Sequence, residues 1–183
     1  PQSLAVVGAS RSKGKLGYDV LANIVHSGYK GKIYPINPKT DSILDIKCYP
    51  DIISLEQPLD MAVFVIPASG VVKSLEECGK KGVKSAVIIT SGFKEVGKEG
   101  AVLEKQVAEI ANKYNMNVLG PNCLGLISMV NNLNASFAAK IPGPGNIAFL
   151  SQSGALGTAI LDWAIKVGIG FSHFISLGNK VDV

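Results

Sequence analysis

A glycine- and serine-rich segment near the start of the chain has the residue types and the position of a phosphate-binding loop. It reads Gly8-Ala9-Ser10-Arg11-Ser12-Lys13-Gly14-Lys15-Leu16-Gly17 and joins a short apolar run to a longer amphipathic segment. The first turn of a helix offers unpaired N–H groups and a positive dipole end to an anion, and glycine lets the backbone approach it. The glycine spacing is not GxGxxG, which argues against a standard NAD site. A tight strand-to-helix turn would also need glycine, so the loop predicts phosphate binding without proving it.

Other polar or small residues follow the remaining predicted strands. In open parallel sheets, ligands bind beyond the carboxyl ends of the strands. The candidate binding residues are Gly8, Ala9, Ser10, Arg11, Asn37, Pro38, Lys39, Ile66, Pro67, Ala68, Ser91, Gly92, Phe93, Pro121, Asn122 and Cys123. None of these strand ends carries a carboxylate or histidine placed for acid–base catalysis, so they predict a cradle for a large ligand. No acidic residue follows the second strand to bind a ribose. Lys39 follows it instead and could contact a 2′- or 3′-phosphate. Phe93 either stacks on a base or caps the core.

A second strand-to-helix turn carries Ser151, Gln152, Ser153 and Gly154. A helix N-terminus of this composition can stabilise a phosphoryl group. A nucleophilic serine would need GxSxG, and Ser151 stands where the first glycine belongs, so a hydrolase is not expected. Ser153 is also a good helix N-cap, which is compatible with phosphate binding.

Metal and thiol chemistry find little support. The chain has two histidines and three cysteines, without CxxC spacing, so no metal site and no disulfide framework is expected. His26 falls on a predicted helix and His173 in a predicted strand, and neither is expected to be catalytic. Cys123 has no neighbouring histidine or arginine to lower its pKa, and we interpret it as a packing residue.

The elements that must position these residues alternate regularly. Continuous apolar runs, typical of strands buried on both faces, alternate with amphipathic helical segments. Strands are expected at 4–7, 32–37, 61–66, 85–90 and 117–119, and helices at 16–25, 69–81 and 98–114. The pattern predicts an α/β fold with a Rossmann-like, doubly wound parallel sheet over residues 1–125. An Asn-, Pro- and Gly-rich linker is expected over 126–145, and a strand, helix and strand over 146–183 predict the first part of a second α/β domain.

Composition limits the function classes. With 47% hydrophobic and 17% charged residues, the 183-residue chain is neither disordered nor rich enough in long apolar runs to span a membrane. The net charge of +4 comes from scattered lysines, whereas nucleic-acid binding would favour a basic stripe. The cysteine usage fits a reducing cytoplasm. The chain does not start with methionine, and we expect it to be a piece of a longer protein.

Several motifs occur in an order that resembles a known family. They are Gly8-Ala9-Ser10, the segment 34–39, Thr90-Ser91-Gly92-Phe93, Gly120-Pro121-Asn122-Cys123-Leu124-Gly125 and Ser151-Gln152-Ser153-Gly154. Together they resemble the CoA-binding domain and following segment of the NDP-forming acyl-CoA synthetases. This family includes the ADP-forming acetate–CoA ligases, relatives of the succinyl-CoA synthetase α subunit. GPNCLG and SQSGAL are the specific pieces.

The resemblance implies that the chain binds CoA or acyl-CoA as part of an acid–CoA ligase. The family's reaction converts acid, CoA and ATP into acyl-CoA, ADP and phosphate, through an acyl phosphate and a phosphohistidine. The phosphohistidine is expected beyond Val183, with ATP, ADP and Mg²⁺ bound by an ATP-grasp domain or β subunit, so this chain alone is expected to be inactive. A homo- or hetero-oligomer is implied. A CoA-sensing domain of a lysine acetyltransferase, or a stand-alone CoA-binding protein, remains the alternative, with an NAD(P)-linked oxidoreductase third.

Overall fold

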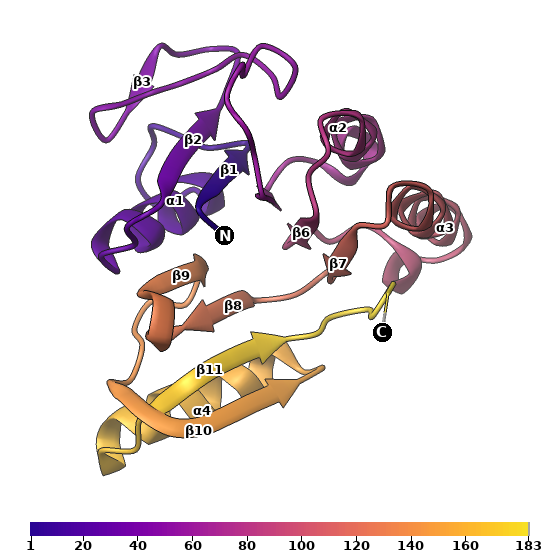
Figure 1. Ribbon diagram of the computed structural model, residues 1–183. Coiled ribbons are helices and arrows are strands. Elements are labelled where there is room, and N and C mark those ends of the chain that lie inside the picture. Colours follow the sequence, from indigo (N-terminus) through magenta and orange to yellow (C-terminus); the bar gives the residue numbers. More distant parts are fainter. Residues whose placement is uncertain (183) are drawn as a thin grey trace.

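The apolar runs of the first 120 residues form a five-stranded parallel sheet. In this computed structural model, which describes residues 1–182, the strands are β1 (Ser3–Val7), β2 (Lys32–Ile36), β5 (Met61–Phe64), β6 (Ser85–Ile88) and β7 (Asn117–Leu119). Their order is β2-β1-β5-β6-β7 (Figure 1), and every neighbouring pair is parallel. All residues of β1 and β5 are buried. The predicted Rossmann-like parallel sheet is therefore confirmed.

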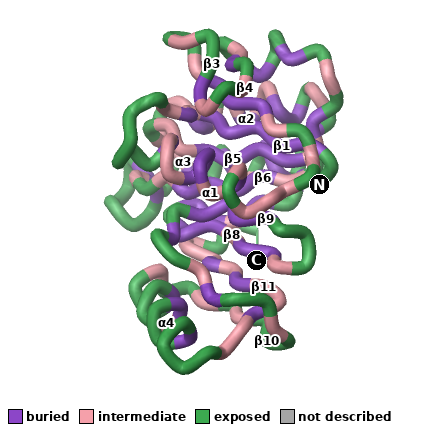
Figure 2. Tube along the Cα trace, turned by 90° about the vertical axis from the view of Figure 1, so that its left-hand side faces the viewer, coloured by how far each residue is buried: buried purple, intermediate pink, exposed green. Residues whose placement is uncertain are grey.

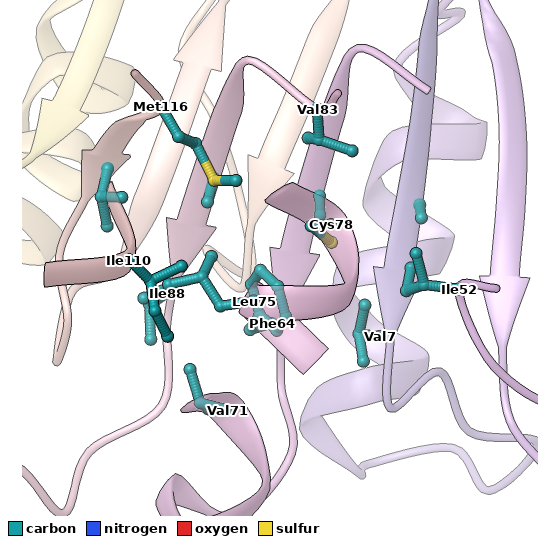
Figure 3. Packing of buried hydrophobic residues seen from close by; sticks show 14 of the residues in the cluster. Val7, Ile52, Phe64, Val71, Leu75, Cys78, Val83, Ile88, Ile110 and Met116 are labelled. Carbon is teal, nitrogen blue, oxygen red and sulfur yellow. The ribbon is translucent and has the colours of Figure 1, made fainter. Parts of the chain in front are cut away.

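Three helices cover the two faces of this sheet. Helix α1 (Leu16–His26) packs with Leu4 and Val6 on one face, whereas α2 (Ala68–Lys80) and α3 (Lys98–Tyr114) pack on the other. Figure 3 shows Leu75 of α2 beside Phe64 and Ile88 of the sheet, and all three side chains are fully buried. Strand side chains alternate between faces, so a strand covered on both sides must be apolar at every position.

The strand order creates a crevice at one edge of the sheet. The chain passes from β1 to α1 on one face, and from β5 to α2 on the opposite face. Because β1 and β5 are neighbours, the connections that follow them diverge at their carboxyl ends. Such a switch point is where open α/β sheets bind ligands.

The remaining strands form a second, mixed sheet. Its order is β10 (Pro144–Ser151), β11 (Phe171–Ser176), β8 (Gly125–Ser128) and β9 (Leu133–Ser136). Strands β10 and β11 are parallel and joined by α4 (Gly154–Val167), which confirms the predicted strand, helix and strand. Leu161 and Ala164 of α4 are buried with Phe171 and Phe174 of β11 in a separate core.

The stretch predicted as a linker over residues 126–145 contains regular structure. It holds most of β8, a 3₁₀ helix η2 (Met129–Asn131) and all of β9, and β8 pairs antiparallel with both β9 and β11. Leu133 and Ala135 of β9 are buried beside α1, on the same face of the first sheet. The expectation of an irregular stretch was wrong because these alternating side chains are buried by α1, which is remote in sequence. The domain boundaries themselves stay a prediction.

Short elements complete the chain. A hairpin of β3 (Ser42–Ile43) and β4 (Ile46–Lys47) turns through Leu44 and Asp45, both with positive φ. A 3₁₀ helix η1 (Lys94–Val96) precedes α3. Within residues 1–182, no helix is both long and apolar enough to cross a membrane.

Candidate functional site

A cleft of about 710 Å³ lies over the carboxyl ends of β1, β2 and β5. Its volume is in the range typical of small-molecule sites. It is lined by many of the predicted residues, namely Gly8, Ala9, Ser10, Asn37, Pro38, Lys39, Ile66 and Pro67, which come from three separate segments. We call it the first cavity. The fold thus brings together residues that are up to 59 positions apart (Gly8 to Pro67), as expected for residues that follow parallel strands.

Two glycines allow the loop after β1 to take its shape. Gly8 has a φ of +92°, and a Cβ there would lie 2.6 Å from Ile66 Cγ2 and 2.8 Å from the Val65 carbonyl oxygen. A Cβ on Gly17 would collide with the carbonyl group of Gly8. A side chain at either position would therefore push the start of α1 or the loop after β5 away, so these glycines set the width of the first cavity.

Asn37 ties two walls of the first cavity together. Its Nδ2 donates to the Ala9 carbonyl oxygen at 2.7 Å, and its Oδ1 accepts from the Lys39 backbone N–H at 2.8 Å. The side chain thus links the end of β2 to the loop after β1. Its bond to the Lys39 N–H also holds the turn that follows β2, which places Lys39 at the cavity. The sequence predicted Asn37 as a ligand contact, whereas its carboxamide is engaged within the protein.

The first cavity also contains charged residues that sequence reasoning missed. Lys15 precedes α1, Lys73 and Glu77 lie on α2, and Asp51 follows β4. Exposed Lys73 and half-buried Glu77 form an ion pair at 4.0 Å, one helical turn apart. The (i, i+4) spacing was visible in the sequence, but nothing there indicated which face of α2 meets the ligand. Three lysines, with Lys39, and two acids therefore line this cleft.

A second cavity of about 350 Å³ lies beside the first, where the two sheets meet. The predicted residues Ser91, Asn122, Cys123, Gln152 and Gly154 line it, together with Leu16, Ile89, Thr90, Leu124 and Phe137. The structure thus brings the turn after β7 and the start of α4 to one place. Leu16 and Phe137 were not predicted, because neither follows a strand of the parallel sheet.

The start of α4 is held by its own serines. Ser153 is the N-cap residue, and its Oγ accepts from the Leu156 backbone N–H at 3.1 Å. Ser151 Oγ accepts from the Ser153 N–H at 3.1 Å. The predicted capping role of Ser153 is confirmed, and the first turn of α4 borders the second cavity through Gly154.

Several predicted residues line neither cavity: Arg11, Ala68, Gly92, Phe93, Pro121, Ser151 and Ser153. Phe93 is fully buried in the core beneath α2 and α3, so its ring caps the core and is not available to stack on a base. The backbone N–H groups of Gly92 and Phe93 both donate to Glu95 Oε1. The ligand contacts of this group stay predictions.

Cys123 is placed as a packing residue. Its thiol is buried and donates to the Ile88 carbonyl oxygen at 3.4 Å. Burial raises the pKa of the Cys123 thiol to about 12, so the thiolate is scarce at neutral pH. The interpretation of Cys123 as a small packing residue fits this environment better than a reactive thiol does.

Asn179, which the sequence did not single out, joins the loops around the second cavity. It follows β11, and its Nδ2 donates to Glu95 Oε2 at 2.6 Å and to Glu104 Oε2 at 2.8 Å. Its backbone N–H donates to the Pro121 carbonyl oxygen at 2.8 Å. Lys94 in turn pairs with Glu104 at 2.8 Å. We call Lys94, Glu95, Glu104 and Asn179 the junction cluster, because it fastens the second sheet to the loop after β6 and the turn after β7.

Neither histidine belongs to these cavities. His26 lies in the last turn of α1, and His173 lies in β11 opposite Ser128 of β8. Among residues 1–182, no group of three or more His, Cys, Asp or Glu side chains is arranged to hold a metal ion.

Comparison with known families decides what this arrangement is. Residues 2–129, more than half of the chain, match the family described as CoA binding domain. The chain belongs to that family. Residues 144–183 match the family described as succinyl-CoA ligase like flavodoxin domain. The resemblance drawn from the sequence motifs is confirmed, and the first cavity lies within the CoA-binding domain.

Relatives of known name support the same assignment. The ADP-forming acetate–CoA ligase of Methanocaldococcus jannaschii is 51% identical, covering 100% of this chain and 25% of the relative. The ADP-forming 4-hydroxybutyrate–CoA ligase of Nitrosopumilus maritimus is 47% identical, covering 98% of this chain and 26% of the relative. The solved structure of dinucleotide-forming acetyl-coenzyme A synthetase 1 from Ca. Korarchaeum cryptofilum, in its apo form, superposes with a TM-score of 0.95 at 45% identity, covering 100% of this chain and 40% of that one.

The chain spans about a quarter of the length of these two curated relatives. It corresponds to the CoA-binding part of ADP-forming acid–CoA ligases.

Proposed function

We propose that this chain binds CoA with the nucleotide half in the first cavity and the thiol end in the second. The single observation that carries the proposal is that the two cavities adjoin along one edge of the sheet. Lys15 lines the first and Leu16, the next residue, lines the second. Thr90 Oγ1 of the second cavity donates to the Ile66 carbonyl oxygen of the first at 2.7 Å. We therefore expect a long ligand in one cavity to be able to reach the other.

The charged residues that line the cavities indicate which end of CoA lies in which cavity. CoA carries its phosphates at the nucleotide end and its thiol at the other. Lys15, Lys39 and Lys73 line the first cavity, whereas the residues that line the second are uncharged. Ammonium groups attract phosphate through charge-assisted hydrogen bonds. The phosphates therefore belong in the first cavity, with Lys39 beside the 3′-phosphate of the ribose.

The full-length protein is proposed to be an ADP-forming acid–CoA ligase. It would convert acid, CoA and ATP into acyl-CoA, ADP and phosphate, with ATP, ADP and Mg²⁺ in an ATP-grasp domain or subunit. The phosphorylated histidine would come from a part of the full-length polypeptide outside this chain. Residues Ser151–Gly154 would then meet the phosphoryl group at the start of α4. His26 and His173 line neither cavity, which supports a phosphorylated histidine from outside this chain.

Exposed apolar side chains on the second sheet support contacts with those other parts. Leu156, Trp163 and Val167 of α4 and Ile147 and Leu150 of β10 are all about half exposed. Figure 2 shows this end of the molecule as mostly exposed. Exposed large apolar side chains gathered in one part of a protein are typical of a protein–protein or domain contact. The proposed assembly is a cytoplasmic homo- or hetero-oligomer.

The proposed function is tested by the reverse reaction in the full-length polypeptide. Acetyl-CoA, ADP and phosphate should yield ATP. Gly154→Leu should lower this rate tenfold or more, because a Cβ there meets nothing within 4 Å and the longer side chain can project into the second cavity. Gly143→Leu is the matched control, since its Cβ also meets open space but lies outside both cavities. Equal rates for the two variants would contradict the placement of the reaction centre.

A further inference from the structure

The second cavity has apolar lining residues that are partly open to solvent. Leu16, at the start of α1, and Phe137, just after β9, line it and are 38% and 40% exposed. Polar residues, Ser91 and Asn122 among them, and the start of α4 also line it. A cavity lined by both apolar and polar groups suits a small molecule that has an apolar tail and a charged head.

The position of Phe137 is set by its backbone, not by burial of its ring. Asn23 of α1 donates through Nδ2 to the carbonyl oxygens of both flanking residues, Ser136 at 2.9 Å and Ala138 at 3.0 Å. The Phe137 N–H donates to the Leu124 carbonyl oxygen at 3.3 Å. The backbone on both sides of Phe137 is thus anchored beside the cavity, while much of the surface of its ring stays open to a ligand.

The wall formed by Leu16 is fixed in a similar way. Leu16 is the first residue of α1, and Gly17, next to it, packs so closely on Gly8 that no side chain fits between them. The start of α1 therefore cannot shift without displacing the loop after β1. Leu16 and Phe137 come from segments far apart in sequence, yet both have anchored backbones and open side chains.

The proposed function places a chemical requirement on this cavity. In thioester formation the CoA sulfur bonds to the carbonyl carbon of the acyl phosphate, the bond from that carbon to the phosphate oxygen breaks, phosphate leaves, and the thiol loses its proton. The carbonyl carbon must therefore come within bonding distance of the thiol. If the thiol lies in the second cavity, the rest of the acyl group must lie against one of its walls. The polar lining residues suit the carboxyl oxygens or a phosphoryl group, and the apolar lining residues remain for the hydrocarbon part.

We propose that Leu16 and Phe137 contact the hydrocarbon part of the acyl group and set which carboxylic acids are accepted. This inference rests on the proposed function. The cavity of about 350 Å³ must hold the thiol end, the carboxyl group and the acyl chain together, which favours short aliphatic acids. Removing the Phe137 ring enlarges the site on the side that faces the acyl chain.

The test is a comparison of acids in the full-length ligase. The ratio of kcat/KM for phenylacetate to kcat/KM for acetate should rise about tenfold or more in Phe137→Ala, the scale on which hydrophobic pockets discriminate size. Leu16→Ala should shift the ratio in the same direction. Phe137→Trp should lower it. Val130→Ala, at a residue 70% exposed in η2 and outside the cavity, should leave it unchanged.

Failure of this inference and failure of the proposed function would give different results. If the variants form acyl-CoA and all retain the parent ratio, the acyl wall is wrong and the proposed function stands. If the unsubstituted polypeptide forms no acyl-CoA from any acid, the proposed function fails and the inference falls with it. The KM for CoA serves as an internal readout, because a change confined to the acyl wall should leave it within about twofold, whereas general loosening of the site would raise it.

Discussion

Replacing Asn179 with alanine should loosen the junction between the second sheet and the loops that line the second cavity. The substitution removes the hydrogen bonds from Asn179 Nδ2 to Glu95 and Glu104, at 2.6 and 2.8 Å. A hydrogen bond to a charged group contributes about 1.5–3 kcal/mol, and less where solvent reaches it. Glu95 is exposed, whereas Glu104 is 7% exposed and keeps Lys94 as a partner. A total loss of about 2–3 kcal/mol follows.

That loss corresponds to a fall in Tm of roughly 4–12 °C for a domain of this size. Differential scanning calorimetry should show it for Asn179→Ala and not for Asn112→Ala, an exposed asparagine on α3. Asn179→Asp should be at least as damaging, because it sets a third carboxylate beside Glu95 and Glu104. A Tm for Asn179→Ala within 1 °C of the Asn112→Ala control would refute the role of the junction cluster.

The same variant has a pH signature. Burial of Glu95 raises its pKa, but hydrogen bonds from Asn179, Gly92 and Phe93 outweigh this, so the net pKa lies below its ordinary value of 4.5. A carboxylate with a lowered folded-state pKa stabilises the fold above its ordinary pKa, and this contribution is lost as the pH falls through the lowered value. The stability difference between the parent and Asn179→Ala should therefore be largest near pH 7 and shrink below pH 4.5. A difference that grows on acidification would contradict this assignment.

Two further predictions concern the first cavity and the start of the chain. Lys39→Ala should weaken CoA binding about tenfold but leave dephospho-CoA nearly unchanged, since a charge-assisted contact to the 3′-phosphate is lost; titration calorimetry that shows equal losses would place Lys39 elsewhere. Asp60→Asn should destabilise the fold by about 1 kcal/mol at pH 7, because hydrogen bonds from the backbone N–H groups of Gln2 and Ser3 hold the pKa of Asp60 below its ordinary value. That difference should vanish as the pH falls through this lowered pKa, and urea unfolding at pH 7 and pH 3 would show whether it does.

The parallel sheet was predictable because its signals are local. Continuous apolar runs closed by glycine or proline mark strands buried on both faces, and amphipathic segments mark the helices between them. Helix α3 was predicted with the bounds that it has, Lys98–Tyr114. Strands β8 and β9 were missed because they are short and lie in an asparagine-rich stretch. Leu133 and Ala135 are buried only because α1 lies beside them.

The residues of the candidate site and of the junction cluster divide in the same way. Residues that follow strands, such as Asn37 and Pro67, could be predicted from the rule that ligands bind at carboxyl ends of parallel strands. Phe137 and Asn179 could not, because their importance comes from contacts with segments far away in the chain. The role of Phe93 could not be predicted either. It follows a strand as the cavity residues do, but its position in the sequence does not show that its ring is fully buried.

The central claim is that the first cavity is a CoA site and not a general dinucleotide site. Titration calorimetry of this protein with CoA and with NAD tests it most directly. The same titrations on the Gly17→Leu variant test whether binding depends on the first cavity, because a side chain at that position collides with the Gly8 carbonyl. We predict that CoA binds more tightly than NAD to the parent and that the variant loses CoA binding. NAD binding as tight as, or tighter than, CoA binding would contradict it.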